Sequence, residues 1–132
     1  MKKWLPIIAR VLMGFVFVAS GIFAFASGFA LPPELPENLR TFTTGLAASI
    51  YFMPFLKGTE IVCGLMLMSG YYVPLALVVL APVIINIFLT HLFLAPEGLI
   101  LATIFVVIEI YLAFFVSPYK EPIRQLFRNP KR

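Results

Sequence analysis

Charged and metal-ligating side chains are scarce in this chain. Only 12% of its 132 residues are charged, and it contains one cysteine and one histidine. A soluble domain of this size needs a polar exterior, so the low charge content argues against a soluble fold. One cysteine excludes an internal dithiol relay, and one histidine excludes bis-histidine ligation of haem by a single chain. No cluster of cysteines or histidines indicates a metal site.

Long apolar runs make up most of the sequence, which is 61% hydrophobic. Four runs of roughly 17 to 25 residues can each cross a hydrocarbon layer about 30 Å thick as a helix. The runs are continuous rather than alternating, which favours helices over a β-barrel. We therefore predict one all-α membrane domain over residues 1–132, a transmembrane four-helix bundle. Its spans are predicted at residues 5–29, 53–69, 74–95 and 98–116.

The first run also resembles a cleavable signal peptide. Lys2 and Lys3 precede it, and the tripeptide Ala24-Phe25-Ala26 lies near its end. The apolar run extends beyond a usual signal core, so we interpret it as a retained span. A three-span product of cleavage would leave the C-terminus on the same side, so charge does not separate the two cases.

Basic residues flank the first and last spans, and lysine and arginine are enriched at cytoplasmic span ends. Both termini are therefore predicted to be cytoplasmic, which agrees with an even number of spans. The basic tail at residues 117–132 is explained more simply by anionic lipids than by nucleic acid. The flanking basic residues are Lys2, Lys3, Arg10, Lys120, Arg124, Arg128, Lys131 and Arg132.

The connection between the first two spans has an amphipathic pattern. Leu39, Phe42, Leu46 and Ile50 recur at helical spacing beside polar residues. This pattern predicts a short helix lying in the membrane interface. A lid over a site below is the alternative interpretation.

Several polar side chains lie deep inside the predicted spans. A charged residue near the bilayer centre costs about 2.5 to 3.5 kcal/mol on the insertion scale, so such groups need partners or a polar cavity. Counting helical rise from the span ends places these residues in overlapping layers of the second, third and fourth spans. We predict that they form a ligand-binding polar chamber in the outer half of the bundle. Its residues are Lys57, Glu60, Asn86, His91 and Glu109.

The buried polar residues can also be interpreted as purely structural, without a bound ligand. Arg10 lies at a depth from which it can reach Glu109 or Glu60, and such an ion pair can be purely structural. Asn86 shares a helix face with Pro82, whereas His91 lies about 140° around the helix from Asn86. His91 is therefore expected to serve packing or the rim of the chamber.

Glycines and polar residues form spaced motifs in all four spans. They read Arg10-x-x-x-Gly14 and Ser20-Gly21, then Leu56-Lys57-x-x-Glu60-x-x-x-Gly64 followed by Leu-Met-Leu-Met-Ser-Gly70, then Pro82-x-x-x-Asn86 with His91-Leu-Phe93, and finally Glu109. Together they cover nearly the whole chain and resemble the DoxX family. Ala24 and Phe25 stand where many members carry a lysine. The resemblance implies a bacterial-type four-helix protein of the inner (plasma) membrane.

The family is named after the membrane part of a thiosulfate:quinone oxidoreductase, but the resemblance implies fold more strongly than activity. Three hypotheses follow. The one we favour is a membrane module that binds a small amphiphile or quinone in a redox-linked context, as a subunit of an oxidoreductase. The second is a small proton-coupled transporter in which Glu60 and Glu109 change protonation. The third is a scaffold that joins a protein partner or a second copy, with purely structural charges.

Overall fold

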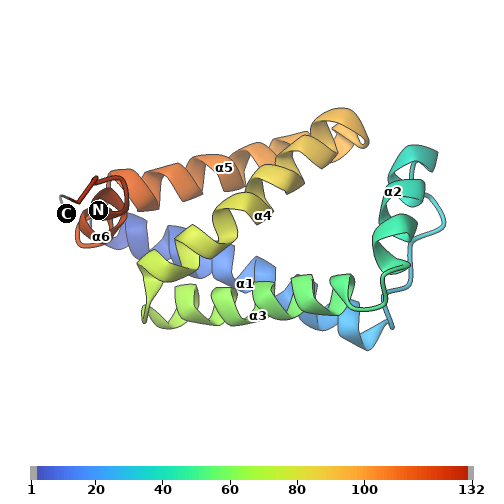
Figure 1. Ribbon diagram of the computed structural model, residues 1–132, viewed down its shortest axis with the longest axis horizontal. Helices are drawn as coiled ribbons and strands as arrows, with labels where there is room; N and C mark the ends of the chain where they lie inside the picture. Colours follow the sequence, from blue (N-terminus) through green and yellow to red (C-terminus); the bar gives the residue numbers. More distant parts are fainter. Residues whose placement is uncertain (1–2, 131–132) are drawn as a thin grey trace.

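The computed structural model describes residues 3–130 and is built from helices. In Figure 1 the long helices run lengthwise through the molecule, with α2 standing across one end and α6 at the other. We call these the α2 end and the α6 end. The predicted flanking residues Lys2, Lys131 and Arg132 lie outside the described residues. The elements are α1 (Trp4–Ala26), α2 (Glu37–Ala47), α3 (Phe52–Ser69), α4 (Val73–Phe93), the 3-10 turn η1 (Pro96–Gly98), α5 (Leu99–Phe114) and α6 (Lys120–Leu126).

The four long helices are long and apolar enough to cross a membrane. Large apolar side chains such as Phe23, Phe93 and Ile100 lie exposed on their surface. Such a surface suits lipid rather than water. The prediction of an all-α transmembrane bundle is confirmed, and the chain is a multi-pass membrane protein. No strand is present between residues 3 and 130.

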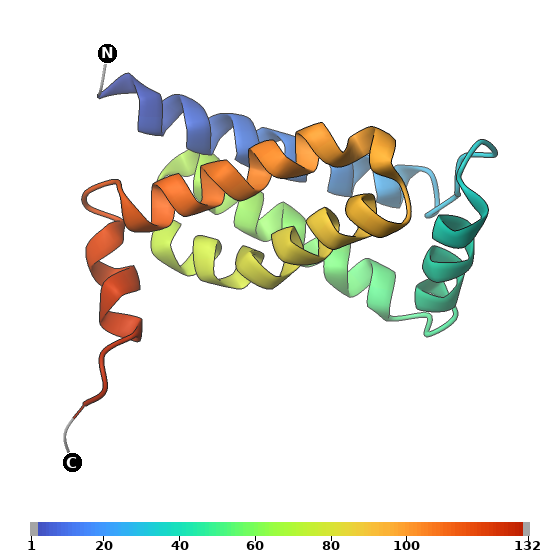
Figure 2. The same cartoon turned by 90° about the horizontal axis from the view of Figure 1, so that it is seen from above.

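The predicted spans match the observed helices to within a few residues. The largest difference is at α1, where the apolar run continues to Phe29 but the helix ends at Ala26. Gly28 and Phe29 both have positive φ angles, 67° and 63°, which stop the helix. The predicted amphipathic helix is confirmed as α2, which has no buried residue and covers the α2 end in both ribbon views (Figures 1 and 2).

The basic tail contains a helix that the sequence analysis did not predict. Glu121 and Pro122 occupy the first turn of α6, a favourable start for a helix. Ile123 is buried against the bundle core, and the ring of Phe127 lies 6.2 Å from that of Phe114 on α5. Apolar anchoring therefore holds the short helix against the end of α5.

The most extensive packing is between α1 and α3, where two glycines face each other. A Cβ placed on Gly14 would lie 2.6 Å from the backbone oxygen of Gly64, and one placed on Gly64 would lie 2.7 Å from the backbone oxygen of Gly14. A Cβ on Gly21 would collide with the side chain of Ile61. Glycine thus lets the two backbones approach more closely than any side chain permits.

Arg10 caps the C-terminal end of α3. Its Nη1 donates hydrogen bonds to the carbonyl oxygens of Leu67 at 2.7 Å and Met68 at 3.1 Å. Carbonyls in the last turn of a helix lack a helical donor, so the guanidinium satisfies them. In place of the expected ion pair with Glu109 or Glu60, Arg10 therefore binds backbone. Counting rise fixes the depth of a residue but not the direction of its side chain.

An Arg10→Leu variant is expected to lose about 2 kcal/mol of unfolding free energy, because a hydrogen bond from a charged group contributes about 1.5–3 kcal/mol. Far-UV circular dichroism during titration of mixed micelles with SDS measures this loss. Arg124→Leu is the matched control, since Arg124 is exposed and pairs with Glu121, which is also exposed; its effect should stay below about 0.5 kcal/mol. Equal stability of Arg10→Leu and wild type would contradict the cap.

Candidate functional site

Lys57 and Glu60 form an ion pair inside the α1–α3 interface. Lys57 Nζ lies 3.3 Å from Glu60 Oε1 and donates to Ser20 Oγ of α1 at 3.2 Å. The side chain of Glu60 is 4% exposed and that of Lys57 20%. Each charge offsets the cost of burying the other, and Ser20 satisfies the ammonium from the facing helix. The two predicted chamber residues are therefore brought together with α1 as an interhelical polar contact.

His91 lies where α4 turns back into α5. Its Nδ1 is 2.9 Å from the carbonyl oxygen of Ile87, one turn earlier in the same helix. The imidazole packs so closely on Gly98 that a Cβ at this position would collide with the ring. The structure thus gives His91 a packing position in the α4–η1–α5 turn. Gly98, whose lack of a side chain makes room for the imidazole, was not identified from the sequence.

Asn86 lies on the exposed surface of α4, next to exposed Pro82. The interior face of this helix is filled by Leu80 and Ile84, which are buried. Asn86 lies about 160° around the helix from Ile84 at 100° per residue. Asn86 therefore faces outward from the bundle. It does not form a chamber wall with Glu60, as the sequence had led us to expect.

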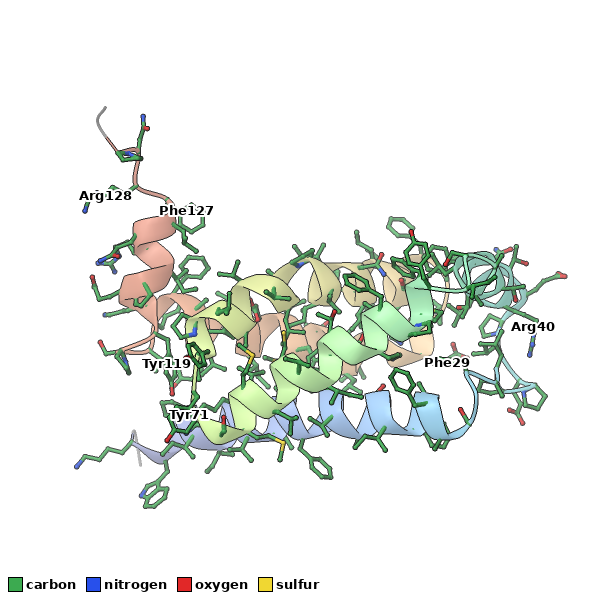
Figure 3. All side chains as sticks on the ribbon, turned by 60° about the horizontal axis from the view of Figure 1, so that its bottom comes forward. Phe29, Arg40, Tyr71, Tyr119, Phe127 and Arg128 are labelled. Carbon is green, nitrogen blue, oxygen red and sulfur yellow. The ribbon has the colours of Figure 1, made fainter. Side chains whose placement is uncertain are left out.

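Glu109 lies in a groove formed by α4, α5 and α6. The groove has a volume of about 360 Å³. Apart from Glu109 its lining side chains are apolar, and Phe127, the residue after α6, is one of them. Figure 3 shows Phe127 and Arg128 on opposite sides of the tail, with Phe127 on the side of the bundle. Other lining residues are Leu77, Ala81, Ile84, Ala113 and Ile123.

Among the described residues, one carboxyl oxygen of Glu109 has no hydrogen-bond partner. Its Oε1 is buried and makes no hydrogen bond within residues 3–130. An isolated carboxylate is unfavourable in apolar surroundings, whereas a carboxyl that exchanges hydrogen bonds with a bound molecule is satisfied. Glu109 is thus the polar group through which a molecule in this groove can be oriented.

The groove does not lie in the half of the bundle where the chamber was predicted. Glu109 is five residues before the end of α5, about 8 Å along the helix axis from the α6 end. Counting helical rise gave only the depth of Glu109 along its span, and no helix was predicted in the basic tail. Ile123, Leu126 and Phe127 follow an i, i+3, i+4 pattern that was the available signal for a helix packed there.

Comparison of the chain with protein-family models, with curated proteins and with solved structures finds no match. Within the described residues no group of three or more histidine, cysteine, aspartate or glutamate side chains is placed to hold a metal ion. The groove and its carboxyl group are therefore the features that indicate a function.

Proposed function

We propose that this protein binds a small membrane-soluble amphiphile of the quinone class in the groove between α4, α5 and α6. The observation that carries the proposal is the Glu109 carboxyl group in the lining of an otherwise apolar groove of about 360 Å³, with its buried Oε1 unpaired among the described residues. Small-molecule sites are typically apolar pockets of about 300–1,000 Å³ with a few polar groups that fix orientation. A quinone fits this chemistry, because its ring is apolar and its carbonyl oxygens accept hydrogen bonds.

The proposal includes a DoxX-like identity and a bacterial-type inner membrane with both termini cytoplasmic. The spaced motifs support the identity, and a redox-linked role depends on the same resemblance. Basic residues at the α6 end support the orientation: Lys3, Lys120 and Arg124 all belong to that end. In this orientation the groove lies in the cytoplasmic half of the bilayer, and α6 lies against anionic headgroups.

Substitution of Glu109 tests the polar contact. In nanodiscs, wild-type protein should show a saturable rise in Tm with a short-chain ubiquinone or menaquinone. Glu109→Leu should weaken binding up to about 10-fold, because one hydrogen bond contributes about 0.5–1.5 kcal/mol. Glu109→Gln keeps an uncharged donor and should bind within about 3-fold of wild type.

Substitution of Ala81 tests the groove itself. Ala81→Phe places a ring in the groove from the α4 wall, so saturable binding should be lost. Val107→Phe is the matched control, since it adds the same ring on the outside of α5, where Val107 is 59% exposed. Absence of any quinone-dependent shift in wild type would contradict the proposal. Saturable binding of tetraphenylphosphonium that Glu109→Gln abolishes would favour the proton-coupled transporter in its place.

A further inference from the structure

Asn86 presents an amide to the lipid side of α4. It is exposed, lies seven residues from the end of the helix at Phe93, and is thus about 10 Å inside the span. Its side chain makes no hydrogen bond to other described residues. Hydrocarbon offers no donor or acceptor, so an amide in this position is unfavourable unless another molecule pairs with it.

The surface around Asn86 is suited to an approaching helix. Leu75, Val79 and Pro82 recur at helical spacing on the same stripe, and all three are exposed. Pro82 has no backbone N–H, so the carbonyl of Val78 loses its helical donor and adds an acceptor near this stripe. Leu75 and Val79 also form one wall of an apolar groove of about 540 Å³ between α3 and α4.

We propose that this face of α4 is a homodimer interface in which the Asn86 side chains of two copies hydrogen-bond to each other. Two copies inserted in the same orientation carry Asn86 at the same depth, and a two-fold axis along the membrane normal brings the amides together. A carboxamide is self-complementary, because each NH₂ donates to the other's oxygen. Lipid tails supply no polar group at this depth, whereas a second copy always does.

Energy transfer between labelled copies measures the interface. Full-length chains that carry donor or acceptor fluorophores at the C-terminus are reconstituted in liposomes over a range of protein-to-lipid ratios. Wild type should dimerise, and Asn86→Leu should raise the dissociation constant about 3- to 20-fold, the range found for hydrogen bonds between membrane helices. Thr103→Val is the matched control, because Thr103 is also exposed but its hydroxyl already donates to the Leu99 carbonyl at 2.8 Å.

Disulfide trapping locates the contact. Val79→Cys lies on the proposed face and should form a cross-linked dimer under mild oxidation, whereas Val107→Cys, exposed on α5, should not. The native Cys63 is buried and can stay in place. A wild-type monomer at every protein density, or an Asn86→Leu variant that associates as tightly as wild type, would overturn the dimer. Neither measurement involves a quinone, so the outcome is separate from that of the groove experiments.

Discussion

A Gly14→Leu variant is expected to lose the native bundle. The first atom of the new side chain would have to lie 2.6 Å from the backbone oxygen of Gly64 and 2.9 Å from Cγ of Met68. Neither α1 nor the backbone of α3 can yield without separating the pair, so we expect a loss of about 3 kcal/mol or more. The SDS titration followed by circular dichroism measures it, and Gly64→Leu should behave in the same way.

Gly58→Ala is the control for this experiment. Gly58 is also inside α3, but a Cβ placed there has no neighbouring atom within 4 Å. Alanine is a better helix former than glycine, so this variant should gain up to about 1 kcal/mol. A Gly14→Leu variant that keeps wild-type stability would show that the two backbones are not in close contact.

A Glu60→Leu variant should lose about 3 kcal/mol of unfolding free energy. The substitution leaves Lys57 in the α1–α3 interface with Ser20 as its remaining polar partner. Removing one member of a buried pair costs about 3–5 kcal/mol, and the lower value applies because Lys57 is 20% exposed. Glu121→Leu breaks an ion pair of the same i,i+3 spacing between exposed side chains, and its effect should stay below about 0.5 kcal/mol.

The double variant Lys57→Met/Glu60→Leu identifies the cause of that loss. Replacing both members of a buried pair with apolar residues is often neutral or stabilising, so the double variant should be more stable than Glu60→Leu alone. A double variant as unstable as the single one would mean that the unpaired ammonium is not responsible.

The number and position of the spans could be predicted from the sequence because hydrocarbon thickness sets the length of an apolar run. The amphipathic helix α2 was predictable for a related reason, since Leu39, Phe42 and Leu46 follow helical spacing in a polar segment. Both features depend on residues that are near one another in the chain. Neither requires knowledge of how the helices pair.

The arrangement of the polar side chains depends on helix pairing, and here the sequence was insufficient. Gly14 and Gly64 determine which faces of α1 and α3 meet, and this contact turns Arg10 toward the end of α3. Packing of Leu80 and Ile84 in the core turns Asn86 outward. The depth of each residue could be counted along its span. The rotation of each helix about its own axis, which sets the direction of the side chains, could not be predicted.

The close contact between α1 and α3 also sets a timescale for biosynthesis. Gly64 follows Gly14 by fifty residues, so at about 5–20 residues per second the ribosome needs roughly 3 to 10 s to supply it. During that interval the carbonyls of Leu67 and Met68 that Arg10 binds do not yet exist. The nascent helix α1 must therefore keep Arg10 near headgroups or water until α3 emerges from the ribosome.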